Sequence, residues 1–443
     1  MQKVALGFFG VIFLGGVLLW LPACNQKPIA FFDSLFTSVS AVCVTGLVTV
    51  IPAEQFTLLG KIILMLLIQI GGLGVIACTM AFFLALRRKI TMKDRVMIQQ
   101  AYGLDTLTGL VRFVIRILKG TLLVEGIGAI LFSIKFVPEY GLYRGIGYGI
   151  FHAISAFCNA GIDILGNNSF IDYASSPLIN FTTMFLIVMG GLGFPVWHNI
   201  RVNTQKVWRG KEPKARLWSR LGLQSKIVLT MTAALILLGT VGFFLLEYNN
   251  PETMKEFSAG QKLMASAFQS VTTRTAGFAA VPQSELTEGS RLLGCILMFI
   301  GGSPGSTAGG IKTTTMFIMI LSIWSEFRKR KDIECFRRRM EENALRHASC
   351  VTMLYGLLIL VGTVLISSAD GVMIQDALFE AASAIGTVGL SLGITAQLGT
   401  VSHIVLILLM FIGRVGGITI LIAFGNRIAC IPSKLPMEKV SVG

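Results

Sequence analysis

The sequence predicts an all-α integral membrane protein, and its long apolar runs are the first observation behind that prediction. The chain of 443 residues is 53% hydrophobic and only 14% charged, whereas a soluble domain of this length needs far more polar surface. Crossing a hydrocarbon core about 30 Å thick takes roughly 20 helical residues. Because the runs do not alternate as barrel strands do, we expect eight transmembrane helices. The runs are 4–22, 56–86, 109–136, 177–200, 226–246, 291–325, 348–368 and 400–425.

The second observation is a motif that recurs four times. Between the two runs of each pair stands a shorter apolar stretch that ends in small residues and a glycine. The copies read FTSVSAVCVTGL (36–47), FHAISAFCNAGI (151–162), AFQSVTTRTAGF (267–278) and FEAASAIGTVGL (379–390). Their glycines, Gly46, Gly161, Gly277 and Gly389, are 115, 116 and 112 residues apart. We therefore expect four tandem helix–pore-loop–helix repeats, 1–95, 96–210, 211–335 and 336–443.

The third copy departs from the other three. Ala267 and Val271 stand where the other copies have Phe and Ser, at ten and six residues before the glycine. Phe268 follows one place later.

The stretch before each glycine is too short to span a membrane. These stretches, 31–43, 146–158, 262–273 and 374–385, have about 12 residues each, the length of a re-entrant segment. Non-helical backbone at membrane depth is tolerated only inside protein or along a water-filled cavity. Four such loops around a pseudo-fourfold axis meet that condition if they line one pore. Close helix packing is the alternative role for the glycines, but it does not explain a short helix before each.

The loops carry the chemistry of a cation filter. A ring of backbone carbonyls can replace the water of a dehydrated cation, and glycine permits the positive φ that such a backbone requires. None of the predicted walls has a carboxylate, which favours a large monovalent cation over calcium. The C-terminal ends of the short helices add a cation preference. The filter residues are predicted to be Val44, Thr45, Gly46, Asn159, Ala160, Gly161, Thr275, Ala276, Gly277, Thr387, Val388 and Gly389.

Together with FIGGSPGSTAGGIKTTT (299–315), these loops and runs resemble the Trk/Ktr/HKT superfamily of potassium transporters over essentially the whole chain. The chain is most similar to the bacterial Ktr-type membrane subunit, because it starts directly at the first pore-forming helix. The resemblance implies potassium uptake, a homodimer with one pore per subunit, and a cytoplasmic nucleotide-binding regulatory ring of the KtrA type. Some relatives have serine at the first filter glycine and pass sodium, so Gly46 implies potassium.

Other functions are weighed against this one. Sodium conduction is the alternative within transport, and sodium is also a candidate activator. No covalently bound cofactor and no metal besides the transported potassium are expected. A membrane enzyme would need a clustered nucleophile, acid–base pair or metal site, and the sequence offers none. The histidines have no ligand spacing, and the cysteines form no Cys-x-x-Cys pair.

The segment 301–315 is the predicted gate. Six of its first ten residues are Gly or Pro, so it cannot form a straight helix. Ile311 separates Gly310 from Lys312, which excludes a Walker A sequence. The resemblance implies a hinged intramembrane loop that blocks ions, with a static kink as the alternative. The gate residues are predicted to be Gly301, Gly302, Gly305, Gly309, Gly310, Lys312 and Arg414.

Arg414 lies inside the last apolar run, 25 residues after Gly389, as Gly302 lies 25 after Gly277. A charge at such depth usually faces a cavity or a partner, so Arg414 is expected to act as an electrostatic barrier below the filter. A salt bridge that serves only packing is the alternative. Arg274, in the third loop, is expected to pair with a carboxylate. The candidates are Glu125 and Glu380; Asp33 and Asp376 read as N-caps of short helices.

The distribution of the net charge of +15 along the chain predicts the membrane topology. The connecting segments 87–95, 201–226 and 328–346 hold 5, 8 and 8 of the 38 Lys and Arg residues, and each follows an even-numbered run. The positive-inside rule then places all three, and both termini, on the cytoplasmic side of the bacterial cell membrane. Nucleic-acid binding is not expected. The basic stretch 328–339 is a candidate for anionic lipid, with a solvated loop as the alternative.

The first run also resembles a signal peptide, because Lys3 precedes its apolar core. The core is long and lacks a small-x-small cleavage site, so we expect a retained first helix.

Overall fold

The computed structural model describes residues 2–74, 78, 99, 109–166, 168–210, 213, 217–330 and 332–416. Nearly all regular structure in these residues is helical, as predicted, and one small hairpin is the exception. The hairpin pairs β1 (Glu334–Cys335) with β2 (Arg338–Arg339) in antiparallel fashion. The helices are α1 (Gln2–Trp20), α2 (Phe31–Cys43), α3 (Pro52–Gln55), α4 (Leu58–Leu73), α7 (Leu110–Tyr140), α8 (Leu142–Cys158), α9 (Pro177–Gly191), α10 (Phe194–Trp208), α11 (Leu217–Arg220), α12 (Leu223–Glu247), α13 (Ala259–Thr272), α14 (Glu288–Phe299), α15 (Thr313–Phe327), α16 (Glu342–Asp370), α17 (Ile374–Gly386) and α18 (Thr400–Val415).

Three described helices are long and apolar enough to cross a membrane alone, namely Leu110–Tyr140, Leu223–Glu247 and Asn343–Asp370. The helices α9 and α10 pass the same test together but meet at an angle of 94°. The apolar helices α1, α4, α15 and α18 are shorter. By length and composition, the described residues therefore support up to four of the eight predicted spans.

The run 177–200 is predicted as one span, and the bend between α9 and α10 departs from that prediction. Its cause is local. Gly193 has a φ of 92° and a ψ of 137°, which no α-helix contains, and Pro195 at the start of α10 cannot continue the hydrogen bonding of α9.

The surface of the long helices is apolar, as expected beside lipid. On α7, the exposed side chains include Leu122, Leu123, Ile130 and Ile134. The short helix α2 shows the opposite pattern, because its buried residues include Ser34, Thr37, Ser38 and Ser40. Soluble proteins rarely expose contiguous apolar patches of this kind, so this distribution supports a membrane protein with polar groups gathered inside.

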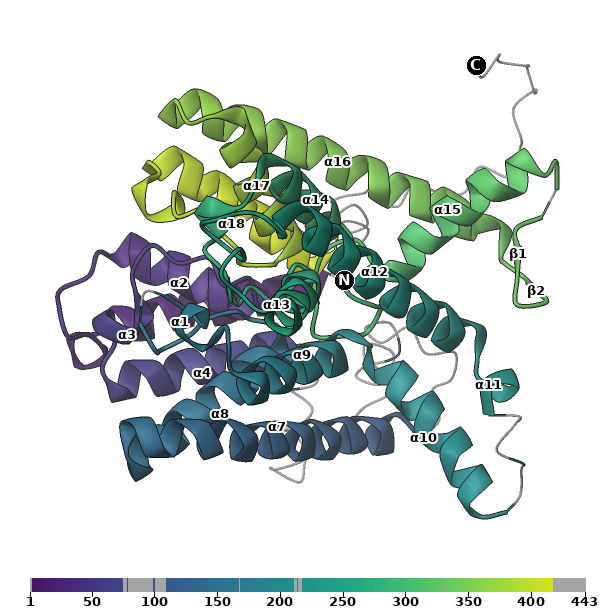
Figure 1. The fold of residues 1–443 in the computed structure, drawn as a ribbon, viewed down its shortest axis with the longest axis horizontal. Helices are drawn as coiled ribbons and strands as arrows, with labels where there is room; N and C mark the ends of the chain where they lie inside the picture. The colour runs from purple at the N-terminus through teal and green to yellow at the C-terminus, as the bar shows by residue number, and fades with distance from the viewer. Residues whose placement is uncertain are drawn as a thin grey trace.

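The helices pack in a closed cycle. The first helix of each copy lies along the short helix that follows it, α1 on α2, α7 on α8, α12 on α13 and α16 on α17. In addition, α4 contacts α8, α9 contacts α13, α14 contacts α17, and α18 contacts α2. The last contact returns the C-terminal helices to the N-terminal ones, and Figure 1 shows yellow α18 beside purple α2. The four short helices therefore surround one centre.

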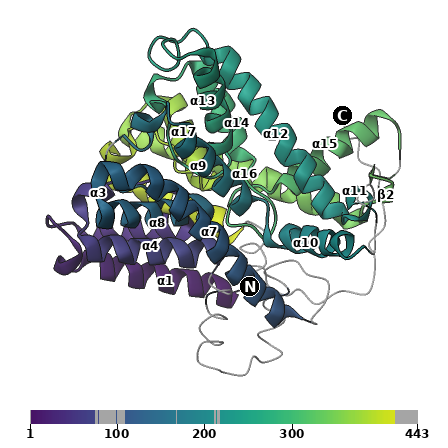
Figure 2. The same ribbon diagram turned by 60° about the horizontal axis from the view of Figure 1, so that its bottom comes forward.

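Two of the basic segments gather at one end of the molecule. The helices α10, α11 and α15 and the hairpin lie together at the right of Figures 1 and 2. Within the hairpin segment, Arg339 forms an ion pair with Asp332 at 3.0 Å. This agrees with the prediction that 201–226 and 328–346 share a side, while 87–95 lies outside the described residues.

The prediction that Asp33 and Asp376 are N-caps is wrong. The helix α2 starts at Phe31 after Ala30, and α17 starts at Ile374 after Met373, with no side-chain cap in either case. Both aspartates lie in the first helical turn instead, where a carboxylate still interacts favourably with the positive helix end.

Candidate functional site

Each repeated glycine is preceded, two residues earlier, by a strained residue. Val44, Asn159, Thr275 and Thr387 have positive φ values of 57°, 61°, 70° and 51°. Three of the four are β-branched, for which this region is a genuine outlier. Such residues cost of order 1–3 kcal/mol each and persist only where the surroundings impose them. The same strain at four equivalent positions marks these loops as the candidate site.

The four glycines meet at the centre of the cycle. Their φ values are positive, 99° for Gly46, 63° for Gly161, 85° for Gly277 and 92° for Gly389. A Cβ on Gly46 would lie 2.5 Å from the carbonyl oxygen of Ala160, closer than real contacts allow. Every glycine is blocked by a carbonyl oxygen of the next copy in cyclic order: Ala160 for Gly46, Ala276 for Gly161, Val388 for Gly277 and Thr45 for Gly389. The structure thus brings the twelve residues predicted for the filter together.

A hydroxyl group at the end of each short helix holds the loop that follows. The Ser40 hydroxyl accepts a hydrogen bond from the backbone N–H of Gly46 at 2.9 Å, and the Ser383 hydroxyl accepts one from that of Gly389 at 3.0 Å. The Ser155 hydroxyl instead donates to a carbonyl just past its glycine, that of Ile162, at 2.6 Å.

The third copy uses Thr272 for this purpose, and its hydroxyl donates to the carbonyl of Phe278 at 2.6 Å. One residue fewer therefore separates the hydroxyl from the glycine in this copy. The same shift explains why Phe268, rather than Ala267, matches the other phenylalanines. Allowing a one-residue gap in the motif would have identified Thr272 from the sequence.

The second helix of each copy breaks in a related tetrapeptide. These read GGLG (71–74), GGLG (190–193), GGSP (301–304) and GRVG (413–416). In three copies the last glycine has nearly the same backbone, with φ and ψ of 85° and 141° at Gly74, 92° and 137° at Gly193, and 91° and 131° at Gly416. The third copy replaces this turn with the longer loop between α14 and α15. Arg414 occupies the place of Gly72, Gly191 and Gly302.

The loop between α14 and α15 folds back on itself. The Lys312 ammonium donates to the carbonyls of Ala308 at 2.8 Å and Gly309 at 3.2 Å. The loop lies directly against the filter, because a Cβ on Gly309 would collide with the side chain of Thr387. The predicted gate segment 301–315, of which 301–312 form the loop and the rest begins α15, is therefore adjacent to a predicted filter residue.

Neighbouring elements bind the loop from two sides. Toward α8 and α9, the Thr307 hydroxyl donates to the carbonyl of Phe157 at 3.1 Å, and the N–H of Ser303 donates to that of Gly191 at 3.0 Å. Toward α10, the N–H of Phe194 donates to the carbonyl of Gly305 at 2.9 Å.

Arg414 closes the remaining side. Its guanidinium donates to the carbonyl oxygens of Thr307, Gly71 and Gly72, the last at 3.1 Å. One side chain of α18 thus joins the loop to the end of α4.

The expected pairing of Arg274 with a carboxylate is wrong for both candidates. Glu380 accepts hydrogen bonds from the hydroxyls of Ser391 at 2.5 Å and Thr395 at 2.8 Å, and from the N–H of Leu392 at 3.2 Å. It therefore anchors the segment that follows the fourth filter loop. Sequence reasoning missed this role because the partners lie in an irregular segment with no motif.

Glu125 also has another partner. Its carboxylate oxygens accept from the amide of Gln69 on α4 at 3.1 and 3.2 Å, while Arg274 donates to the hydroxyl of Thr232 at 3.4 Å. Within the described ranges, no cluster of three His, Cys, Asp or Glu side chains could hold a metal ion.

Residues 2–431 match the TrkH family, described as cation transport protein. The chain belongs to this family. Its members transport cations, so this TrkH-family protein is a transporter and not an enzyme, and the resemblance read from the four motifs is confirmed.

Curated relatives cover nearly the whole chain. It is 36% identical over 425 residues to the Ktr system potassium uptake protein B of Bacillus subtilis (strain 168), covering 96% of this chain and 93% of the relative. It is 37% identical over 451 residues to the potassium/sodium uptake protein NtpJ of Enterococcus hirae, covering 100% and 97%. The potassium transporter TrkH of Vibrio parahaemolyticus has the same fold, with a TM-score of 0.75, 19% identity, and coverage of 95% of this chain and 84% of that one.

Proposed function

We propose that this protein carries potassium into the cell through a filter formed by its four glycine loops. The observation that carries the proposal is the closed cycle in which each filter glycine faces a carbonyl oxygen of the next copy. Four strained backbones maintained at equivalent positions indicate that this arrangement is selected for what it binds. The chain then consists of four pore repeats, 1–95, 96–210, 211–335 and 336–443, with eight transmembrane helices around a pseudo-fourfold axis.

The chemistry of the loops supports a monovalent cation. The twelve filter residues include no carboxylate, so the ion is coordinated by neutral carbonyl dipoles. Calcium sites, by contrast, are rich in carboxylates. The Bacillus relative is named as a potassium uptake protein and the Enterococcus relative as a potassium/sodium uptake protein. Both names agree with a site for a monovalent cation. Entry needs no bound cofactor, because the membrane potential supplies about 2.3 kcal/mol per charge per 100 mV.

The loop at 301–312 acts as the gate in this proposal. It lies against Thr387, and hydrogen bonds connect it to three other parts of the chain. Ions can pass only when some of these bonds break. Arg414 adds an electrostatic barrier at the same place, because its charge repels cations that leave the filter.

The partners follow from the Ktr-type relatives. We propose a homodimer in the bacterial cytoplasmic membrane, with both termini cytoplasmic and a nucleotide-binding regulatory ring of the KtrA type beneath the basic segments. Movement of that ring would release the loop, and sodium is a candidate activator of the assembly.

Cation flux into liposomes that contain the purified protein tests the proposed function. Potassium, rubidium, sodium and lithium are compared under the same imposed potential. Entry of potassium and rubidium far above that of sodium supports the filter. If neither the intact protein nor a variant lacking the gate loop carries any of the four cations, the proposed function is refuted.

Sodium conduction is the second candidate. It is favoured by the relative named as a potassium/sodium uptake protein, which is 37% identical to this chain. Equal entry of sodium and potassium in the same liposomes would support it.

A further inference from the structure

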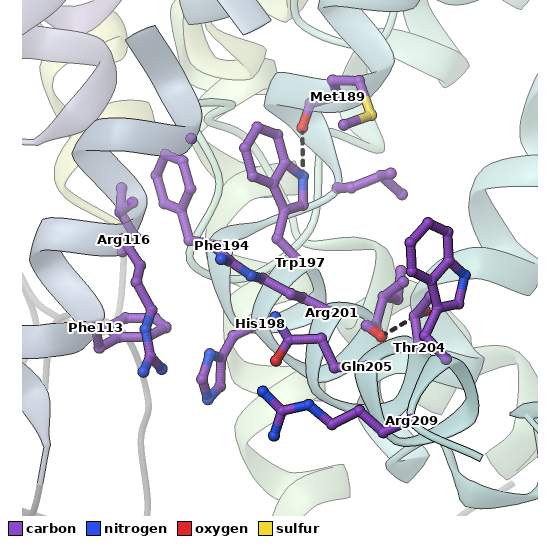
Figure 3. A pocket seen from close by; sticks show the side chains of 15 residues that line it. Phe113, Arg116, Met189, Phe194, Trp197, His198, Arg201, Thr204, Gln205 and Arg209 are labelled. Atoms are coloured by element: carbon purple, nitrogen blue, oxygen red, sulfur yellow. Dashed lines mark hydrogen bonds between the residues drawn. The ribbon is translucent and has the colours of Figure 1, made fainter. Parts of the chain in front are cut away.

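A cavity of about 710 Å³ opens beside the bend between α9 and α10, and none of the residues predicted for the filter lines it. Its walls are mostly apolar and aromatic, and include Phe113 and Ile117 of α7, Met189 of α9, and Phe194 and Trp197 of α10. The Trp197 indole donates to the carbonyl of Met189 at 3.1 Å, which fixes this wall across the bend (Figure 3). Cavities that hold small ligands have this size, about 300–1,000 Å³.

Three arginines add positive charge to this apolar cavity. Arg116 of α7, Arg201 of α10 and Arg209, which directly follows α10, are exposed residues that line the cavity (Figure 3). The charges of Arg116 and Arg201 both act on the ring of His198, which lies near them. No lining residue is acidic, and the ion pairs found in the described part of the chain involve none of the three arginines.

The combination of three cations with apolar walls specifies an amphipathic anion. A free phosphate would satisfy the arginines but would gain nothing from the phenylalanine and tryptophan walls. An acyl chain would gain from the walls but not from the arginines. Trp208, at the rim, is 89% exposed, as tryptophans at a membrane–water interface often are.

We propose that this cavity binds one anionic phospholipid, with its phosphate on the arginines and its acyl chains along the aromatic walls. The cavity lies on α10, at the end of the molecule where the basic segments gather. The proposed function enters only in naming the cytoplasmic leaflet as the source of the lipid, which follows from the proposed orientation.

The lipid would contact a residue that holds the gate. Phe194 lines the cavity, and its backbone N–H bonds to Gly305 of the loop at 2.9 Å. A lipid between α7 and α10 therefore supports the element to which the loop is bound.

The test measures lipid retained by the purified full-length protein. The protein in detergent is incubated with phosphatidylglycerol or with phosphatidylcholine of the same acyl chains, and bound lipid is quantified after gel filtration. The double variant R201Q/R209Q is compared with K206Q, which removes a charge from an exposed position of the same helix outside the cavity. Each arginine is expected to contribute about fivefold in affinity, as a basic residue near an anionic membrane does.

Wild type and K206Q should retain phosphatidylglycerol in preference to phosphatidylcholine, and R201Q/R209Q should bind it about 25-fold more weakly. Equal retention of both lipids by the wild type, or unchanged retention by the double variant, would overturn the proposal. If millimolar inorganic phosphate, or an uncharged apolar peptide, displaced all of the bound phosphatidylglycerol, the lipid proposal would be overturned in favour of that ligand.

A second readout leaves the arginines in place. In a variant that keeps Trp197 and Trp208 and has phenylalanine at the other three tryptophans, Trp20, Trp218 and Trp324, phosphatidylglycerol brominated on its acyl chains should quench the fluorescence more than brominated phosphatidylcholine does. Equal quenching would count against the site. Because neither readout measures ion flux, failure here leaves the proposed function untouched.

Discussion

Replacing Gly46 with serine should reduce the discrimination of this protein between potassium and sodium. A Cβ at this position would lie 2.5 Å from the carbonyl oxygen of Ala160 and 3.2 Å from the Cα of Gly389. Real contacts of this kind are not shorter than 3.0 Å, so the walls must move apart by about 0.5 Å. That equals the tolerance of about 0.5 Å within which a binding site must be held.

The expected magnitude is about tenfold in the potassium-to-sodium flux ratio, the effect of about 1.4 kcal/mol. Serine at the positive φ of 99° should also destabilise the fold by about 1–2 kcal/mol. The assay compares potassium and sodium entry into liposomes that contain equal amounts of folded protein.

The control for G46S is G393S. Gly393 has a similar φ of 90°, but a Cβ there meets nothing within 4 Å. It therefore reproduces the backbone strain without the collision. If G46S keeps the wild-type flux ratio, or if both variants lose it equally, the collision with the carbonyl wall is not what sets selectivity.

Three further predictions concern the gate loop, the Ser383 hydroxyl that holds the fourth glycine loop, and the Asp163 carboxyl group that follows the second glycine loop. Deleting residues 304–309 should raise cation flux, because it removes the segment bound by Arg414 and Phe194; reduced or unaltered flux in a folded deletion would exclude a blocking loop. S383A should lower the free energy of unfolding by about 1–3 kcal/mol, because the buried N–H of Gly389 loses the acceptor that lies 3.0 Å away. Thermal unfolding measures this change. The control is S402A, whose hydroxyl has no partner among the described residues and whose loss should have little effect on thermal unfolding. Burial raises the pKa of Asp163 to about 6, although hydrogen bonds to its carboxylate, such as that from the N–H of Leu165, lower the pKa. The folded state thus binds this proton more tightly than the unfolded state, and stability should fall as pH rises from about 4 to about 6; D163N should lack this part of the pH dependence, and an identical profile in D163N would show that another group titrates.

Local sequence determined the positions of the short helices and the loops. The stretches predicted at 31–43 and 374–385 are observed as Phe31–Cys43 and Ile374–Gly386. The stretches predicted at 146–158 and 262–273 begin earlier than predicted, as Leu142–Cys158 and Ala259–Thr272, but end within one residue of the predicted position. Both the apolar run and the glycine that ends it are local signals, so neither needs knowledge of the rest of the chain. The family could be recognised for the same reason, since four copies of one motif at nearly equal spacing require only the sequence.

Only the tertiary structure decided which residues meet. The partners of Glu125 and Glu380 proved to be Gln69 and Ser391, because a buried carboxylate takes whichever donors its packed neighbours present, and sequence cannot rank donors from different elements. Three other features likewise depend on helices far apart in the chain packing together. These are the cyclic order of the loops, the use of the Thr272 hydroxyl in the third copy, where Val271 stands at the serine position, and the contact of Arg414 with Thr307. The sequence thus specified the four glycine loops, and long-range packing set which carbonyl each glycine faces.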